Sequence, residues 1–341
     1  MAYIRVLFFS ALITSFVYLA TALILIDIPI PAEYWVSEMI TIKKALVREQ
    51  TGKNKIIIAG GSSTLFGIDA KDASYQLGIP TINFGLHAGL QLDKILQEAS
   101  SAAEPGDIMI LPLEPPYYEC PRKLSSWQIE NIIGWDHQAW HQMDYVEKAE
   151  FISLISPSVF SQMIIAGIQK VFFPDRLNGR LNSLNAAFVL YKFRTRTPPS
   201  TFQYSAYHLD NHGDISNAVG AKFSGDASPF SKPDSVCPET ASKLTGFVDR
   251  MKANGVRVFF ANTPYIGPVE ENAKINKAEL GFQKEFGSIG CFIDKREYLV
   301  FDRKYFFNTS LHLNTKGREL RTNLLINAIR QNTVQGACQQ Y

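Results

Sequence analysis

The chain begins with a long stretch that carries no charged residue. It runs from Val6 to Ile26, with Arg5 before it and Asp27 after it. As an α-helix this run would be about 31 Å long, which matches the hydrocarbon thickness of a bilayer. Few soluble helices are apolar on every side over such a length. The pattern therefore predicts a transmembrane helix, and we assign residues 1–28 to a membrane anchor.

A cleaved signal peptide is the alternative to an anchor. Ala20-Thr21-Ala22 has the small-residue form that signal peptidase cuts, but the apolar run continues beyond it to Ile26. We therefore favour an uncleaved signal anchor. Basic residues flank the run on both sides and leave its orientation undecided, but long domains translocate largely regardless of charge. We place residues 29–341 outside the cytoplasm, which makes the chain a single-pass protein of the cell membrane.

Beyond the anchor, short apolar runs alternate with stretches of helical spacing. Residues 29–54 form a juxtamembrane helix and linker, and the alternation fills residues 55–341. Apolar runs that suit strands buried on both faces occupy 55–59, 81–83, 107–111 and 256–260, with a shorter fifth at 291–293. Helical spacing occupies 90–103, 239–254, 270–286 and 315–331. This order predicts a three-layer α/β/α domain with a parallel sheet.

Residues 121–235 interrupt the alternation. They are rich in Trp and Pro and contain few clean strands. We predict a large, mostly helical or irregular insertion that packs over the open end of the sheet. Within it, Phe151 to Phe173 is apolar but carries several Ser residues. A second membrane span is the alternative there, and we favour a helix pair that lies on a surface or forms a lid.

Composition excludes several classes of protein. The chain has 341 residues, of which 46% are hydrophobic and 19% are charged. These values exclude a disordered chain, a collagen and a coiled coil. Lys and Arg total 34 against 32 Asp and Glu, a formal net charge of +2. Without a strongly basic balance we expect no nucleic-acid partner.

The four cysteines form no C-x-x-C pair, which argues against a zinc knuckle or a thioredoxin-type site. In an exported domain they permit one or two disulfides, with three full pairings. Inert buried thiols are an equal alternative.

Candidate chemistry lies where strands end. The first strand leads into Gly60-Gly61-Ser62-Ser63, at the edge of the sheet where ligands of open α/β folds bind. Glycines permit a sharp turn, and a Ser directly after them exposes its hydroxyl beside backbone N–H groups. A structural turn without a catalytic role would have the same composition. The Walker pattern of a phosphate loop is absent, because no Gly-Lys-Ser/Thr follows.

A second candidate precedes the last helix. Asn308 to His312 forms a polar loop, followed by Leu313-Asn314 and Gly317. A His in such a loop reaches across a sheet edge to a Ser on the first strand. Taken alone, this His is more often a structural loop residue.

Together, the two segments resemble the SGNH/GDSL hydrolase superfamily. Gly60-Gly61-Ser62 stands where that family has Gly-Asp-Ser. Asn308 to His312 resembles the family's last block, in which an acidic residue shortly before the His completes a triad. The resemblance covers roughly residues 55–118 and 238–331.

The chain resembles one branch more closely, the membrane-anchored members encoded with membrane-bound O-acyltransferases. These include proteins of the lipoteichoic-acid D-alanylation and alginate O-acetylation type. In that branch Gly-Ile-Asp often follows five residues after the Ser, and here Gly67-Ile68-Asp69 follows Ser62 at this offset. The offset favours Ser62 over Ser63, which remains the alternative nucleophile.

The resemblance implies a Ser62 nucleophile, a His312 general base and Asn308 as the residue that orients it. Two departures from the family bear on activity. The expected acid is Asn308, which cannot stabilise an imidazolium by charge, and Asp294 or Asp302 are substitutes without the family's spacing. The third strand leads to Glu114 where the family has Gly-x-Asn-Asp. The missing oxyanion-hole Asn is then replaced by the Gly85 N–H, the Ser62 N–H or the Asn83 side chain.

Other polar clusters give weaker predictions. A helical His137 and His141 with nearby carboxylates suit a metal, although the default is no metal and no cofactor. For the cluster over 208–214 a solvated turn is the default. The aromatic residues Trp127, Trp135, Trp140, Tyr204 and Tyr207 either stack on sugar rings or, by preference, pack within the insertion.

The sequence thus favours a membrane-anchored O-acyltransferase or esterase. It would transfer an acyl group, by preference acetyl, to an extracytoplasmic polysaccharide or to water. Its expected partners are a membrane-bound O-acyltransferase, the glycan and the membrane. The alternative is a catalytically inactive relative that binds glycan or serves as a scaffold in an envelope polysaccharide complex.

Overall fold

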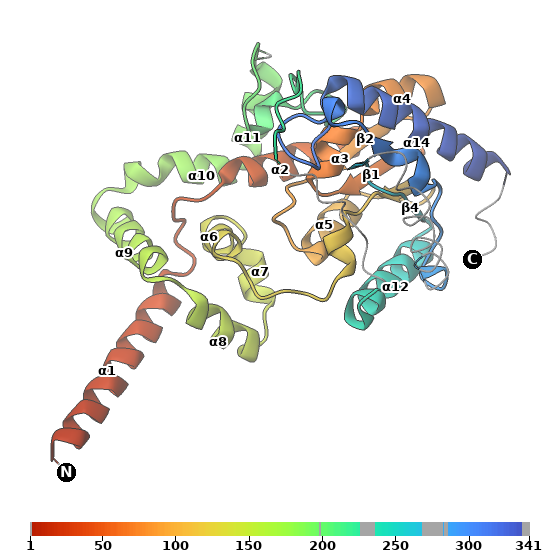
Figure 1. Cartoon of the computed structure of the whole chain (residues 1–341). Coiled ribbons are helices and arrows are strands. Elements are labelled where there is room, and N and C mark those ends of the chain that lie inside the picture. The colour runs from red at the N-terminus through yellow and green to blue at the C-terminus, as the bar shows by residue number, and fades with distance from the viewer. Residues whose placement is uncertain (1, 198, 226–235, 268–281, 283–285, 336–341) are drawn as a thin grey trace. The chain divides into compact units, whose positions relative to one another are not determined.

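The computed structural model shows a mixed α/β protein (Figure 1). It describes residues 2–197, 199–225, 236–267, 282 and 286–335. The chain divides into two compact units, which are described separately. The first unit comprises residues 1–38 and 123–192, and the second comprises residues 39–122 and 193–341. The boundary between the units differs from the bounds predicted for the insertion, 121–235. The later part of that segment, from residue 193 onward, belongs to the unit that contains the sheet.

The second unit is built on a parallel sheet, as the apolar runs predicted. Its strands are β1 (Ile56–Gly60), β2 (Thr81–Gly85), β3 (Ile108–Leu111) and β4 (Arg257–Phe260), in the order β2-β1-β3-β4. The predicted strand at 291–293 is reduced to a single bridge between Phe260 and Phe292. A separate two-stranded pair, β5 (Tyr265–Ile266) and β6 (Val300–Phe301), was not predicted.

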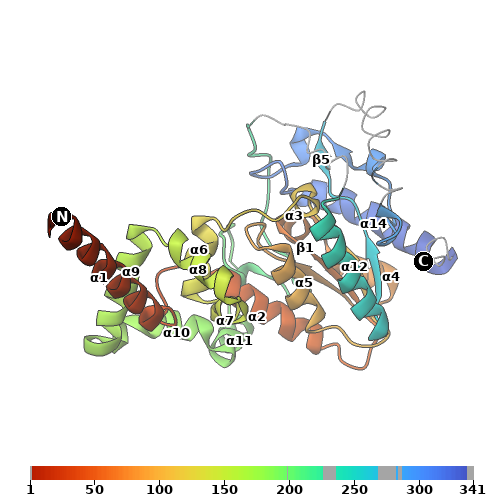
Figure 2. The same cartoon turned by 90° about the horizontal axis from the view of Figure 1, so that it is seen from below.

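Helices cover both faces of this sheet (Figure 2). Ile56 and Ile58 of β1 share a buried cluster with residues of α4 (Ala70–Leu77) and α14 (Thr315–Gln335). Ile57 points to the opposite face because side chains alternate along a strand, and it is fully buried too. That face is next to α5 (Leu92–Ser100) and α12 (Pro238–Ala253), which contact β1 and β4. Most of the predicted helix over 270–286 lies outside the described residues.

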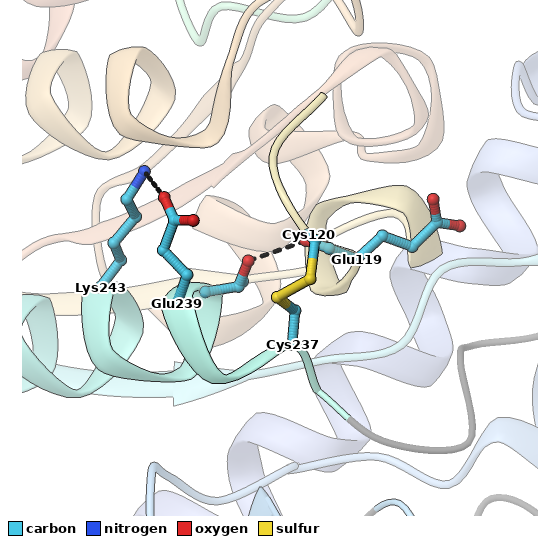
Figure 3. Close-up of a disulfide and its surroundings, with 6 residues drawn as sticks. Glu119, Cys120, Cys237, Glu239 and Lys243 are labelled. Carbon is cyan, nitrogen blue, oxygen red and sulfur yellow. Dashed lines mark hydrogen bonds and ion pairs between the residues drawn. A yellow bond between two sulfur atoms is a disulfide. The ribbon is translucent and has the colours of Figure 1, made fainter. Parts of the chain in front are cut away.

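Other elements of the second unit are short. They are α3 (Ser62–Gly67) and the 3₁₀-helices η1 (Pro115–Tyr118), η3 (Ala206–His208), η5 (Arg296–Leu299) and η6 (Arg303–Tyr305). A disulfide joins Cys120, just after η1, to Cys237 at the start of α12 (Figure 3). The Thr240 hydroxyl donates a hydrogen bond to the Glu119 carbonyl beside it. Cys291 is disulfide-bonded as well, so these three cysteines are not the inert thiols of the alternative prediction.

The first unit is helical. It contains α1 (Ala2–Leu25), α6 (Ser126–Gly134), α7 (His137–Gln142), α8 (Tyr145–Leu154), α9 (Pro157–Phe172), η2 (Pro174–Leu177) and α10 (Asn178–Leu184). The helices α2 (Tyr34–Arg48) and α11 (Ala186–Thr195) each cross the boundary between the units. The end of α1 enters the core of this unit, where Ala22 and the following Ile26 pack with residues of α6, α8 and α9.

One N-terminal helix is long and apolar enough to span a membrane. It covers Tyr3–Leu25, as the uncharged run predicted. The second apolar stretch, Phe151–Phe173, is divided between α8 and α9, which meet at an angle of 99°. The pair is therefore a bent helical element rather than one straight span.

Candidate functional site

The order of the strands marks one place on the sheet for a ligand. The chain leaves β1 toward β2 on one side, and later adds β3 on the other side of β1. Loops that leave β1 and β3 at their carboxyl ends therefore diverge, and such a switch point is where open α/β sheets form a ligand crevice. Ser62 lies two residues after β1, and Glu114 lies three residues after β3.

Close packing forces glycine into the turn after β1. A Cβ on Gly61 would lie 2.6 Å from Oε1 of Glu114, and one on Gly85 would lie 2.2 Å from the Leu65 backbone nitrogen. The carboxyl end of β2 thus contacts the backbone of α3 directly. Gly61 ends the turn as the N-cap of α3, and Ser62 is the first residue of the helix.

The two candidate nucleophiles have different surroundings. Ser62 is 6% exposed and Ser63 is 2% exposed. The Ser63 hydroxyl is buried, and within the described residues it has no hydrogen-bond partner. The Ser63 N–H donates to Glu114, whereas the Ser62 N–H donates to no acceptor in the part of the chain that is described. Of the two, Ser62 combines the greater exposure with an unengaged N–H.

His312 and Asn308 meet as the loop pattern predicted. Nδ1 of His312 lies 2.8 Å from Oδ1 of Asn308. The amide nitrogen of Asn308 donates to the Tyr204 hydroxyl at 2.8 Å, which turns the amide oxygen toward the imidazole. An amide oxygen only accepts, so Nδ1 must carry the proton and Nε2 keeps its lone pair. This is the tautomer that a general base needs.

His312 contacts the helix that begins with Ser62. Its ring stacks on Phe66 of α3, with 4.0 Å between the ring centroids and 10° between the planes. Phe66 is four residues after Ser62, so both lie on the same face of the helix, where such side chains are about 5–6 Å apart. Helical side chains also tilt toward the N-terminus, which brings the Phe66 ring toward Ser62. No hydrogen bond joins the Ser62 hydroxyl to His312 among the described residues.

The imidazole is neutral at neutral pH. Burial, together with a smaller contribution from the nearby His87, lowers the pKa of His312 from 6.5 to about 3. His87 follows β2 at the same edge of the sheet and accepts a hydrogen bond from the Gly89 N–H. Sequence reasoning missed His87, although its position four residues after the end of the predicted strand over 81–83 was a usable signal. Two histidines thus gather near α3, and His312 is available in its basic form.

Neither substitute acid contacts His312 in the described structure. Asp294 forms an ion pair with Arg321 at 3.0 Å and accepts a hydrogen bond from the Asn262 N–H. Asp302 accepts from the Lys304 N–H at the start of η6. The imidazole therefore depends on the uncharged Asn308 for its orientation.

Glu114 occupies the amino end of α3. Its carboxylate accepts hydrogen bonds from the N–H groups of Ser63, at 2.8 Å, and Gly61, at 3.1 Å. The side chain is buried, and burial raises its pKa from 4.5 to about 7, although the two N–H groups oppose this shift. A negative group at a helix N-terminus is favourable, but here it uses two donors that an oxyanion would otherwise find.

The predicted oxyanion donors Gly85 and Asn83 are already engaged. The Gly85 N–H donates to Oδ1 of Asn83 at 2.9 Å. The Asn83 amide nitrogen donates to Asp214 at 3.0 Å and to the Thr64 carbonyl at 3.2 Å. These bonds hold β2 against α3, so either group would have to release a partner before it could bind an oxyanion. The Ser62 N–H has no such constraint.

The loop over 208–214 packs against the edge strand β2, and it is not the solvated turn that we predicted. The Asn83 N–H donates to the His212 carbonyl at 2.9 Å. The Asp214 carboxylate is buried and also accepts from the Ala70 N–H at 2.8 Å. Burial raises the pKa of Asp214 to about 7. Gly213 has a φ of +80° and lies directly on the strand, which explains a glycine at the turn.

Aromatic side chains surround His312 and Phe66. Phe202 lies 5.7 Å from Phe66 and 4.9 Å from Phe307, measured between ring centroids. Tyr204 lies 6.2 Å from Phe66 and is 45% exposed. Of the predicted sugar-stacking aromatics, Tyr204 is thus part of this cluster, whereas Trp140 is buried in the core of the first unit against Phe151.

The other candidates lie apart from this site. On α7, His137 contacts the Ile133 carbonyl, whereas His141 contacts Asp27 at 3.0 Å. Within the described residues no group of three or more His, Cys, Asp or Glu side chains is arranged to hold a metal. A cavity of about 450 Å³ lies at the Thr81 end of β2, beside Ser74 and His212. That is the opposite end of the strand from Gly85, so the cavity is not part of the Ser62 site.

Comparisons with known proteins give no relative. No family model, no curated protein and no solved structure matches the chain.

Proposed function

We propose that this chain is a membrane-anchored serine esterase or O-acyltransferase with an SGNH-type α/β/α domain. Ser62 is the nucleophile, His312 the general base, and Asn308 the residue that orients the base. One observation carries this proposal. His312, held by Asn308 in its basic tautomer, stacks on Phe66, which lies four residues after Ser62 on α3, at the carboxyl edge of a parallel sheet.

The chemistry follows from these positions. The Ser62 hydroxyl attacks the carbonyl carbon of an acyl donor, while Nε2 of His312 takes its proton. The Ser62 N–H stabilises the negative oxygen of the tetrahedral intermediate. His312 returns the proton to the leaving oxygen or sulfur, which leaves an acyl group on Ser62. An acceptor hydroxyl or water then attacks this ester, again with His312 as the base, and the acyl group is transferred.

Asn308 limits the rate of this reaction. It fixes the ring but provides no negative charge to stabilise the imidazolium that forms during attack. In a serine protease triad, the change of Asp to Asn lowers the rate by about 10⁴. A low pKa of His312 adds to this cost, because a weaker base takes the Ser62 proton less readily. We therefore expect slow turnover.

The resemblance of the motifs supports a substrate class. We propose that the acyl group is small, by preference acetyl, and that the acceptor is a hydroxyl of an extracytoplasmic polysaccharide. The half-exposed Tyr204 beside the His312 cluster offers a face on which a sugar ring can stack. A membrane-bound O-acyltransferase would supply the acyl group from across the bilayer.

A second candidate function is a catalytically inactive subunit that binds glycan. Glu114 favours it, because its carboxylate occupies the two N–H groups of Gly61 and Ser63 beside the nucleophile. The retained His312–Asn308 pair favours the enzyme.

Hydrolysis of p-nitrophenyl acetate by the detergent-solubilised full chain distinguishes the two functions. For an enzyme we expect slow turnover with an initial burst, and loss of both in Ser62→Ala and in His312→Ala. Equal background rates in all three proteins, together with intact binding of an acetylated polysaccharide, would favour the inactive subunit.

A further inference from the structure

Helix α9 presents apolar side chains on two opposite faces. Val159, Met163 and Ala166 are buried in the core of the first unit. At 100° per residue, the opposite face carries residues that are 39–71% exposed, namely Ile164, Ile165, Ile168, Val171 and Phe172. A contiguous row of exposed apolar side chains on a helix normally marks a surface that protein or lipid covers. Within the described part of the chain, the outward face of α9 therefore lacks a partner.

Contacts within the first unit fix α9 beside the end of the membrane helix. The Tyr18 hydroxyl of α1 donates to the Ile152 carbonyl at 2.9 Å, just before α9. The Tyr18 ring lies 4.7 Å from that of Phe160. Farther along, Leu25 packs so closely on Gly167 that a Cβ there would lie 2.7 Å from it. The helices α1 and α9 are adjacent in both views of the chain (Figures 1 and 2).

These contacts set the depth of α9 relative to the anchor. Tyr18 precedes Leu25 by seven residues, or about 10 Å along α1. Helix α9 therefore lies alongside the last two turns of α1, within about 10 Å of the end of the span. Interfacial helices bury their apolar face about 5–10 Å deep at the boundary between headgroups and acyl chains.

We propose that α9 is a second, monotopic membrane contact, with its Ile164–Ile168–Phe172 face inserted into the lipid surface at which α1 ends. The bilayer is the occupant because the face is continuous with α1, whose own apolar side chains, such as Ile24 at 75%, are exposed in the isolated chain. Basic residues lie at the same end of the helix. Lys170 is exposed, and Arg176 lies over the Phe173 ring at 5.0 Å. Such residues favour anionic headgroups.

Spin labels on the full chain test this contact. The described cysteines are disulfide-bonded, so a single introduced cysteine is the site that a nitroxide reagent labels. Ile168→Cys and Phe172→Cys are labelled and reconstituted in vesicles of phosphatidylethanolamine and phosphatidylglycerol at 3:1. Asn182→Cys, on an exposed polar position of α10, is the matched control. Power saturation measures how often the nitroxide collides with oxygen, which partitions into lipid. It also measures how often the nitroxide collides with a nickel complex that stays in water.

Oxygen collisions should exceed nickel collisions several-fold at residues 168 and 172, and the ratio should reverse at residue 182. Ile165→Cys provides a second site on the same face in case one label disturbs folding, and near-native circular dichroism is required of each variant. Nickel-dominated collisions at 165, 168 and 172 in folded protein would overturn the proposal. The vesicles contain no other protein, so burial against a protein partner cannot give the expected result.

Discussion

His312 owes its protonation state to two neighbours with different effects. Asn308 determines which ring nitrogen carries the proton, through a hydrogen bond of 2.8 Å. The buried stack on Phe66 removes water from the ring and thereby lowers the pKa of His312 to about 3. The residue is thus a well-oriented but weak base, and the uncharged Asn308 is the position at which its strength can be changed.

Replacing Asn308 by Asp should strengthen this base. A carboxylate at 2.8 Å from Nδ1 stabilises the imidazolium, so the pKa of His312 rises and attack by Ser62 becomes easier. We expect p-nitrophenyl acetate hydrolysis to increase, with about 10⁴ as the upper limit. The same variant should move the acidic limb of the pH–rate profile to higher pH. Asn308→Ala, which removes the orienting oxygen, should lower the rate, and equal rates in all three proteins would contradict this role.

Glu114 should make the stability of the second unit depend on pH. Its pKa is about 7 in the folded chain, against 4.5 ordinarily, so between these values the folded state binds more protons than the unfolded state. Stability then falls as the pH rises through this window. The Gln side chain of Glu114→Gln does not titrate in this window. Relative to that variant, the free energy of unfolding of the wild type should fall by up to about 3 kcal/mol between pH 4.5 and 7.

Thermal unfolding of the full chain in detergent measures this difference. Glu319→Gln removes an exposed carboxylate on α14 and serves as the control. A constant offset between wild type and Glu114→Gln across the window would show that Glu114 does not carry a raised pKa.

At the scale of elements, helix α2 stabilises an otherwise open strand edge. β2 lies at the end of the sheet, so its outer backbone groups have no neighbouring strand. Lys43 of α2 is fully buried, and its ammonium donates to the carbonyls of Asn83 and Gly85, each at 2.7 Å. The loop at His212 pairs with the same strand. Both covers form hydrogen bonds with the backbone of Asn83.

Lys43→Met should therefore destabilise the fold strongly. Two buried carbonyls lose their donor, and each unsatisfied group costs about 1–3 kcal/mol. The neighbouring Lys44 provides a matched control, because it forms a partly exposed ion pair with Glu98, which also pairs with Lys94. Lys44→Met should cost at most about 1 kcal/mol. Thermal unfolding of the two variants side by side measures the stability that each one loses. Comparable losses of stability would contradict the role of Lys43 in covering the edge of β2.

The sequence predicted those elements whose local pattern is sufficient. Buried strands form continuous apolar runs, such as Ile56-Ile57-Ile58, and the sequence located all four strands of the sheet, although β4 begins with an exposed Arg257. The strands β5 and β6 have two residues each, which is too few to give a recognisable pattern of apolar and polar residues. The division of the insertion was missed because the return of residues 193–225 to the sheet depends on contacts distant in sequence, such as that between Asp214 and Asn83.

The same limit applies to the site. Ser62 and the Asn308–His312 loop were predicted from motifs, and the structure brings the loop onto α3 through Phe66. Glu114 was recognised as a departure, but its bonds to the Gly61 and Ser63 N–H groups depend on how β3 lies beside β1. Lys43 resembled an ordinary surface lysine, since nothing local marks a side chain that will be buried against a strand edge.

At the scale of the whole molecule, the two units carry different properties. The candidate membrane helix and α9 belong to the first unit, and the site residues Ser62, Asn308 and His312 all belong to the second. The small formal charge of +2 agrees with a substrate that is held by shape, aromatic faces and hydroxyl contacts.

The most direct measurement of the central claim is labelling of the full chain by a fluorophosphonate, which reacts with activated serines. Intact mass should show one adduct on the wild type and none on Ser62→Ala. Ser63→Ala should keep the adduct, since the Ser63 hydroxyl has no partner to lose among the described residues. In His312→Ala we expect labelling to slow at least about 10²-fold, as the loss of a general base predicts. Labelling that persists in Ser62→Ala, or that is absent from folded wild type, would contradict the assignment of Ser62 as the nucleophile.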